Sequence, residues 1–492
     1  MNSWKNITSL NYSQIKELQD QRLHHFINTH VYPFSPYYRK LFDENKINPR
    51  DIRTRDDLRR IPFISKSDLI DRDNQQKFKD FILQPDKEKI SRSWSKLRLL
   101  KLALKALLQG SRVEDDLVKE YRPVFMTFTT GTTNSPVPFM YSRYDLDNLY
   151  VSGGRMVELF DIMGDERIMN LFPFAPHLAF WQTFFGAIQA DLFSLSTGGG
   201  KVMGTEGNLT ALLKMKPSTI LGVPSYVYHL IRHAQEKGSD LSFLKKIVLG
   251  AAKVTPAYKQ KLADMLRSQG VEKAHIFGTY GFTEARTAWA ECPTENHLSS
   301  GYHLYPDKEI FEIIDPLTGE VKDDAGDGEL VYTSLDSRTS VMLRYRTGDL
   351  VKGGIIYEPC PYCGRRTLRL SSDITRLSDN KDIHLSKVKG TLVNLSHFAE
   401  VLNDIPQVNE WQLEIRKHKD DPYDVDEIVI YVTPQADANQ HNLTQVIKEK
   451  LTGATEIAPN EIKFIPLDEM VKKLELETAN KEKRIIDVRP KG

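Results

Sequence analysis

The chain of 492 residues is poor in cysteine and carries no excess of either charge. Its only cysteines are Cys292, Cys360 and Cys363, too few and too unevenly spaced for the disulfide framework of a small secreted domain. Basic and acidic side chains number 67 and 66, so no overall field favours nucleic acid, and none is expected as a partner.

Long apolar runs are also missing. No stretch reaches the roughly 18 apolar residues of a membrane-spanning helix, and the first six residues are too polar to begin a secretory signal. We therefore expect a soluble, cytoplasmic protein. Its length exceeds what one hydrophobic core usually supports, so two or three domains are expected.

A threonine-rich stretch lies between the apolar runs 124–126 and 137–142, which predict a hairpin-like pair of short strands. Clustered hydroxyls and backbone amides suit a loop that wraps a phosphate, and Gly and Asn tolerate the positive φ that such a nest needs. An ordinary threonine-rich turn is the alternative. The stretch reads Thr129, Thr130, Gly131, Thr132, Thr133, Asn134, Ser135 and Pro136.

Short apolar segments then alternate with helical ones, which predicts an α/β domain with a mostly parallel sheet. The expected strands are 167–172, 218–223, 246–249 and 275–277, and the expected helices are 180–188 and 226–234. A glycine-rich segment, 196–202, resembles a phosphate loop only superficially. Lys201 is followed by Val202 rather than Ser or Thr, so we interpret it as a connection.

Two further motifs carry nucleotide-type chemistry. In the first, at 277–284, Tyr280 can lie against a purine, Thr283 can donate to a phosphoryl oxygen, and Glu284 can hold Mg²⁺. It follows a predicted strand, where open α/β sheets bind ligands. In the second, at 343–349, the carboxylate of Asp349 can accept hydrogen bonds from both ribose hydroxyls.

The segments TTGTTNSP, GTYGFTEA and RYRTGD, in this order, resemble the core motifs of the adenylate-forming superfamily, most closely its phenylacetate-CoA ligase branch. SPYYRKLF, RRIPFISKSDL, KPSTILGVPSYVYHL, EIIDPLTGE, GELVYTSL and the closing NKEKRIIDVR are similar to further segments of that branch. The resemblance implies a large multi-layer N-terminal α/β domain, 1–376, and a small mobile α+β C-terminal lid domain, 377–492. It also implies ATP- and Mg²⁺-dependent activation of a carboxylic acid to an acyl-adenylate, followed by thioester formation with CoA.

The resemblance also implies roles for individual residues. The threonines at 129, 130, 132 and 133, with Gly131, would hold the β and γ phosphates, and Glu284 and Thr283 would act at the reacting phosphoryl group. Near the α-phosphate, Lys481 would offset negative charge, with Lys483 as the second candidate. The adenosine would contact Gly250, Ala251, Ala252, Tyr280, Gly281, Asp349 and Arg376.

Several positions depart from the family pattern. Asn134 and Asn480 replace usual glycines, Leu395 replaces a usual proline, and the hinge at 375–382 leaves Asp379 as its expected pivot. The first half-reaction should survive these changes, but two alternatives stay open. The acceptor could be the phosphopantetheine of an acyl carrier protein or another nucleophile, or the chain could bind nucleotide without chemistry. The identity of the acid and the oligomeric state, including a dimer, are also open.

Cys360 and Cys363 form half of a structural zinc site. Cys292 can supply a third thiolate, and His297 or His303 a nitrogen. The family resemblance favours His303, because the segment Gly301-Tyr302-His303-Leu304 resembles the family's Gly-Leu-His segment. We therefore expect a structural Zn²⁺ held by Cys292, His303, Cys360 and Cys363. Three buried reduced cysteines without metal are the alternative.

Two stretches have further functional interpretations. At 94–109, leucines fall on one helical face and Arg98, Lys101 and Lys105 on another, which favours a membrane surface, an acidic carrier, or simply a packed helix with solvated lysines. Aromatic residues at 172–185 would suit an aryl or apolar acyl group, although Phe184 and Phe185 are equally consistent with core packing. His177 is a candidate contact to the carboxylate or thiol.

Overall fold

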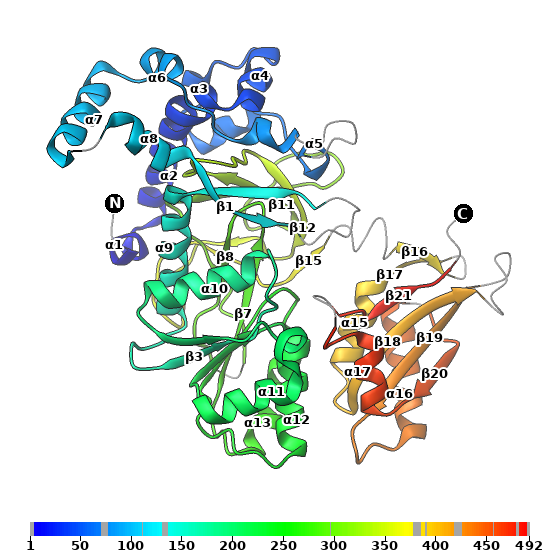
Figure 1. Ribbon diagram of the computed structural model, residues 1–492. Coiled ribbons are helices and arrows are strands. Elements are labelled where there is room, and N and C mark those ends of the chain that lie inside the picture. The colour runs from blue at the N-terminus through cyan, green and yellow to red at the C-terminus, as the bar shows by residue number, and fades with distance from the viewer. Residues whose placement is uncertain are drawn as a thin grey trace.

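The computed structural model describes residues 4–69, 77–110, 112–129, 136–295, 297–376, 385–388, 391–417, 426–455, 457–478 and 482–489. Figure 1 shows helices at the N-terminal end, a large sheet with its covering helices in the middle, and a separate C-terminal group. The first eight α-helices are α1 (Trp4–Ser9), α2 (Tyr12–Phe26), α3 (Tyr32–Phe34), α4 (Pro36–Glu44), α5 (Lys66–Leu69), α6 (Lys87–Ser93), α7 (Lys96–Gln109) and α8 (Val113–Tyr121).

A nine-stranded sheet organises the middle of the chain, in the order β13-β14-β9-β8-β7-β6-β5-β3-β4. From β4 to β7 neighbouring strands are parallel, and from β7 to β13 they are antiparallel. The strands are β3 (Arg167–Asn170), β4 (Phe193–Ser196), β5 (Thr219–Gly222), β6 (Lys246–Leu249), β7 (His275–Phe282), β8 (Thr287–Ala290), β9 (Tyr302–His303), β13 (Ile355–Ile356) and β14 (Arg369–Leu370).

Five helices pack against this sheet (Figure 1). All four residues of β5 and of β6 are buried, as expected for parallel strands covered on both faces. The predicted strands and helices of this region are therefore confirmed. The helices are α9 (Arg143–Leu159), α10 (Leu178–Gln189), α11 (Gly200–Met215), α12 (Pro224–Glu236) and α13 (Pro256–Arg267).

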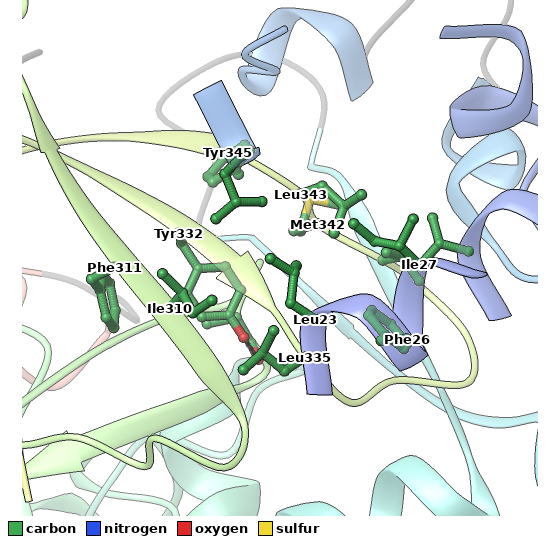
Figure 2. Packing of buried hydrophobic residues seen from close by; sticks show 14 of the residues in the cluster. Leu23, Phe26, Ile27, Ile310, Phe311, Tyr332, Leu335, Met342, Leu343 and Tyr345 are labelled. Atoms are coloured by element: carbon green, nitrogen blue, oxygen red, sulfur yellow. Dashed lines mark hydrogen bonds between the residues drawn. The ribbon is translucent and has the colours of Figure 1, made fainter. Parts of the chain in front are cut away.

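The N-terminal helices share one core with a second sheet, which has the order β10-β11-β12-β15. Figure 2 shows Leu23 and Phe26 of α2 facing Ile310, Tyr332 and other apolar side chains of these strands. The hairpin β1 (Pro123–Phe128) and β2 (Pro138–Ser142) is antiparallel, as predicted. The second sheet consists of β10 (Glu309–Ile314), β11 (Gly328–Ser334), β12 (Tyr345–Val351) and β15 (Ile374–Arg376).

The C-terminal residues have a hydrophobic core of their own, around Trp411, Leu413 and Ile430. It lies between two helices and a four-stranded sheet of order β20-β19-β18-β21, so an α+β arrangement is confirmed here. The elements are β16 (Leu385–Val388), β17 (Thr391–Asn394), α15 (Leu395–Asn403), β18 (Val408–Lys417), β19 (Asp426–Pro434), α16 (Gln440–Thr455), β20 (Glu461–Phe464), α17 (Leu467–Leu474) and β21 (Ile485–Asp487).

Buried ion pairs connect the C-terminal group to α12. Glu410, which is 2% exposed, pairs with Arg484 at 2.9 Å and with Arg232 of α12 at 3.7 Å. Lys253 pairs with Asp373 and with Glu400 of α15. The proposed domain boundary at 376/377 adjoins residues 377–384, which include Asp379 and lie outside the described residues.

Two elements differ in extent from the sequence prediction. Strand β7 continues through Phe282, because Thr279 to Phe282 pair with Ala290 to Thr287 of β8, so Tyr280 and Gly281 lie within a strand. The helix expected at 94–109 begins at Lys96, where the Ser95 side chain accepts a hydrogen bond from Arg98 N. Trp94 is buried before it. Within the described ranges, no helix is long and apolar enough to cross a membrane.

Candidate functional site

The base of the threonine-rich loop is a closed hairpin end. Thr129 N donates to Val137 O, and Val137 N donates to the Thr129 hydroxyl, both at 3.1 Å. Beside it, His177 Nδ1 lies 3.2 Å from Phe128 O. The hydroxyl of Thr129 therefore fixes the loop ends. Thr130, Gly131, Thr132, Thr133 and Asn134 lie outside the described residues, so their phosphate contacts stay predictions.

The segment Gly250-Ala251-Ala252 follows β6 directly, at the carboxyl end of the parallel strands. A Cβ at Gly250 would lie 2.5 Å from Thr279 Oγ1 and 3.2 Å from the Phe172 ring, so only glycine fits there. Ala251 has φ 69°, an uncommon backbone conformation for alanine that is found most often at functional turns. The segment is thus placed where α/β sheets bind ligands.

Tyr280, Asp349 and Arg376 come together from β7, β12 and β15. Tyr280 Oη donates to Asp349 Oδ2 and Arg376 Nη1 to Oδ1, each at 2.7 Å. Burial and the neighbouring Asp349 carboxylate raise the pKa of Tyr280, so its hydroxyl remains a donor. A carboxylate offers about four acceptor positions, and Asp349 keeps capacity for a hydroxyl-bearing ligand.

Glu284 lies in the turn after β7 and is 7% exposed. Its Oε1 accepts a hydrogen bond of 2.8 Å from Tyr345 Oη, while in the described part no hydrogen bond reaches Oε2. Thr283 is half-buried beside it. A Cβ at Gly281 would lie 2.6 Å from Ala288 Cβ, so glycine is required there for the close approach of β7 and β8.

An aromatic stack supports Tyr280. Its ring lies 5.7 Å from Trp289 and 5.9 Å from Tyr302, at interplanar angles of 26° and 30°. Trp289 in turn donates to Glu309 Oε1 at 2.9 Å. Glu309 is almost fully buried, and burial raises its pKa to about 8. Sequence reasoning missed these supports, because they join residues distant along the chain.

The predicted zinc ligands form one compact cluster. The ligand atoms of Cys292, His303, Cys360 and Cys363 all lie within 4.8 Å of one another. Cys292 Sγ is 3.6 Å from Cys360 Sγ, and Cys363 Sγ is 3.7 Å from His303 Nε2. Two thiolates on one tetrahedral Zn²⁺ stand about 3.8 Å apart, so the donors fit this metal in type, number and spacing.

Surrounding residues orient the cluster. The Nδ1 atom of His303 lies 3.2 Å from Thr367 Oγ1, which leaves Nε2 facing the thiols, as metal-binding histidines require. Contact with the other two cysteines raises the pKa of Cys292, so only a cation would allow all three thiols to ionise together. His297 lies outside this group, and the structure therefore brings His303, not His297, to the cysteines.

Glu291 connects the cluster to the nucleotide motif, although sequence reasoning gave it no role. It precedes Cys292 and accepts hydrogen bonds from Gly278 N and Ser299 Oγ. Lys259 pairs with it at 2.6 Å, and the two side chains are 1% and 3% exposed. Displacement of Cys292 would therefore be transmitted to β7 two residues before Tyr280.

Aromatic side chains of β1, α10 and the preceding loop form a cluster where the sequence predicts the acyl group to bind. Phe125 lies 5.2 Å from Trp181 and 5.8 Å from Phe185, and Phe174 lies 5.9 Å from Trp181. Phe174 is 60% exposed. Phe125 lies in β1, which ends at the loop base, and Trp181 lies in α10, which begins directly after His177. An apolar group at this cluster would therefore lie near the predicted phosphate site.

Of the two candidate C-terminal lysines, only Lys483 lies among the described residues. Lys481 lies outside the described residues. Lys483 Nζ pairs with Glu475 Oε1 at 2.6 Å, and its backbone N donates to Leu474 O. An amine held by a carboxylate of its own domain is less available to a phosphate, so the structure favours Lys481 as the residue to test first.

The comparisons with known proteins agree with this arrangement. The family model of AMP-binding enzymes matches residues 49–345. The chain belongs to this family. The matched segment contains Gly250, Tyr280 and Glu284, while Asp349 and Arg376 follow shortly after it.

Among curated proteins, this AMP-binding enzyme is similar to phenylacetate-CoA ligases. It is 25% identical to that of Aromatoleum evansii, across 99% of this chain and 97% of the relative, and 25% identical to that of Thermus thermophilus, across 84% and 80%. An indoleacetate–lysine synthetase of Pseudomonas savastanoi is 26% identical across 50% and 59%. The predicted resemblance is confirmed: the chain is an AMP-binding enzyme that is similar to phenylacetate-CoA ligases.

A solved structure has the same fold. A 2-hydroxyisobutyryl-CoA ligase in the postadenylation state aligns with a TM-score of 0.75 at 18% identity, covering 99% of this chain and 92% of the other. The mixed α/β fold predicted from the sequence is thereby confirmed over the length of the chain.

Proposed function

We propose that this enzyme activates an apolar, aryl-type carboxylic acid with ATP and transfers the acyl group to CoA. The observation that carries the proposal is the gathering of two carboxylates near one guanidinium: Asp349, which accepts from Tyr280, and Glu284 both raise the pKa of Arg376. Asp349 binds the ribose hydroxyls. Glu284 would hold Mg²⁺ through the oxygen that accepts no protein hydrogen bond in the described part, and the ion would neutralise phosphate charge.

In the first half-reaction a carboxylate oxygen of the acid attacks the α-phosphorus, and the bond from that phosphorus to the bridging oxygen breaks. Pyrophosphate leaves with the bonding electrons. The chain supplies charge and position, through the threonine-rich loop and Lys481, rather than a covalent intermediate. In the second, the thiol sulfur of CoA attacks the carbonyl carbon, AMP departs, and the thiol proton passes to solvent.

The acid is proposed to occupy the aromatic cluster of Phe125, Phe174 and Trp181. Similarity to phenylacetate-CoA ligases supports an aryl group. The indoleacetate–lysine synthetase, whose name indicates an amine acceptor, keeps transfer to a non-CoA acceptor as the second candidate. The thiol of a carrier protein would attack the carbonyl carbon of the acyl-adenylate in the same way as the thiol of CoA.

The cysteine cluster is proposed to hold a structural Zn²⁺ with no open coordination position, because all four ligands come from the protein. Zinc measured at one equivalent per chain supports this assignment. Clearly less than one equivalent in pure, active protein contradicts it.

The functional test measures products with aryl, indolyl and short branched acids, each offered CoA, lysine or no acceptor. Rapid formation of AMP and an acyl-CoA thioester from an aryl acid, only when CoA is present, supports the proposal. Thioester formation restricted to small branched acids contradicts the substrate class. An acyl-lysine product, with no response to CoA, establishes the alternative acceptor.

A further inference from the structure

Helix α7 has two apolar faces, and only one of them is covered. Leu99, Leu102 and Ala106 turn toward the protein, where the two leucines pack against the large N-terminal core. Five other leucines are exposed, at 63%, 56%, 49%, 78% and 85% of their surface: Leu97, Leu100, Leu104, Leu107 and Leu108. Their spacing of three or four residues places them on one stripe.

Cations border this leucine stripe on both sides. At about 100° per residue, Lys96 falls on one edge of the stripe, and Lys101 and Lys105 fall on the other. All three are exposed, none forms an ion pair within the described residues, and α7 contains no acidic residue. Arg98 differs, because it lies 3.9 Å over the Trp94 ring and is held against the protein.

We propose that α7 docks this enzyme on an anionic lipid surface, with the leucine stripe in the acyl-chain boundary and the three lysines at the headgroup phosphates. Apolar residues flanked by flexible cations characterise helices that lie in a membrane interface. With 14 residues, α7 extends about 21 Å, shorter than a bilayer core of about 30 Å, so it lies flat. The docking surface is independent of the proposed reaction.

The position of α7 favours a lipid surface over a carrier protein or a second copy of this chain. In Figure 1, α7 projects at the end of the molecule remote from the C-terminal group and from β7, β12 and β15, which carry the nucleotide residues. A carrier protein docked on α7 would hold its thiol far from the acyl-adenylate. A second copy related by twofold symmetry would bring the two lysine borders together, and like charges repel.

The test is flotation of the full chain with vesicles of phosphatidylcholine alone and of phosphatidylcholine mixed with phosphatidylglycerol. We expect the wild type to float with the mixed vesicles, less with the neutral ones, and progressively less as salt rises. Two variants probe the two parts of the surface: Leu104→Gln/Leu107→Gln/Leu108→Gln and Lys101→Glu/Lys105→Glu. Each should lower partition into mixed vesicles by about tenfold or more.

The matched control is Leu317→Gln, which alters a leucine that is 80% exposed in the turn after β10. It should float like the wild type. Circular dichroism should show the same folded structure in every variant, since all the altered side chains are exposed. Failure of the wild type to float at low salt contradicts the proposal, as does equal flotation of the leucine variant. Light scattering that finds a wild-type dimer split by the leucine variant, with no vesicle binding, assigns the face to self-association.

Discussion

Tyr280 of the proposed nucleotide site and His303 of the cysteine cluster lie in β7 and β9 of one sheet, while Asp349 comes from β12 of the second sheet. The two sites are built differently. Asp349 and Glu284 are hard oxygen ligands that keep acceptor capacity beyond their protein partners. The cluster has four soft ligands in mutual contact, with His303 and Cys292 at most 1% exposed. The difference teaches how neighbouring strands can present open oxygen acceptors, suited to an exchangeable ligand, at one point and a closed group of thiols and imidazole at another.

Loss of one metal ligand should have the largest effect. Cys360→Ser removes a thiolate from a site that folds around its metal, so we expect loss of stoichiometric zinc and about 4 kcal/mol of the free energy of unfolding. Metal analysis and denaturant titration measure the two effects. Tyr362→Phe, between the two cysteines, is the control and should keep its zinc. A stable, zinc-free Cys360→Ser protein would disprove the structural role.

Among the substitutions, the second-largest loss of stability is expected when the ion pair between Lys259 and Glu291, which connects the cysteine cluster to β7, is broken. Lys259→Met leaves the Glu291 carboxylate buried without its cation, which typically costs about 3 kcal/mol. Because Glu291 also holds Gly278 N, nucleotide binding should weaken while zinc remains bound. Calorimetric ATP titration and metal analysis on the same samples test this, with Lys237→Met, on an exposed lysine, as control. Loss of zinc together with unchanged ATP binding would contradict the connection.

Asp349→Asn should lower adenylation by about 100-fold, since it replaces a charge-assisted acceptor by a neutral amide in a site organised by Arg376. Stability should also fall, because the amide nitrogen cannot accept the hydrogen bond that one carboxylate oxygen takes from Tyr280 or Arg376. The assay is the rate of acid-dependent adenylation, and Asp315→Asn, in an exposed turn, is the control. A rate equal to the wild type would remove Asp349 from the nucleotide site.

Stability should fall as pH rises from about 5 to 8, partly because of Glu309. Its pKa is about 8 in the folded protein and near 4.5 when unfolded, so the unfolded state releases its proton first as pH rises. The effect is about 3.5 kcal/mol over this range. Glu309→Gln removes the titrating group and should flatten the dependence, measured by denaturant titration at each pH. The same slope in both proteins would exclude Glu309 as its source.

The smallest effect is expected at Lys483. Its ion pair with Glu475 joins side chains that are 55% and 36% exposed, and such pairs contribute about 0.5 kcal/mol or less. Lys483→Ala should therefore keep both stability and adenylation close to wild type. Lys481→Ala should lower adenylation strongly. The reverse result in the same assay would transfer the catalytic role to Lys483.

The sequence located the parallel strands and the cysteine ligands because each carries a local signature: short apolar runs, a two-residue cysteine spacing, and motifs at strand ends. It identified Tyr280, Glu284 and Asp349 as polar residues of the site, but not the hydroxyl of Tyr345 on Glu284. Nor could it show Glu291 between Lys259 and Gly278. Tyr345 lies in the second sheet and Lys259 in α13, so these contacts depend on how separate elements pack together, which no local pattern encodes.

Helix α7 shows a second reason for such gaps. Its periodicity predicted an amphipathic helix correctly, yet the same pattern is compatible with leucines packed on the domain or directed outward. Only tertiary packing distinguishes Leu99 and Leu102, which contact the core, from Leu104 and Leu107, which do not.

The central claim, acyl-adenylate formation at the Asp349 and Glu284 site, is tested most directly by ATP–pyrophosphate exchange in the absence of CoA. The account predicts exchange that requires an aryl acid and Mg²⁺, and that falls about 100-fold in Asp349→Asn. No exchange with any acid, in protein shown by calorimetry to bind ATP, would contradict it and identify the chain as a nucleotide-binding protein without this chemistry.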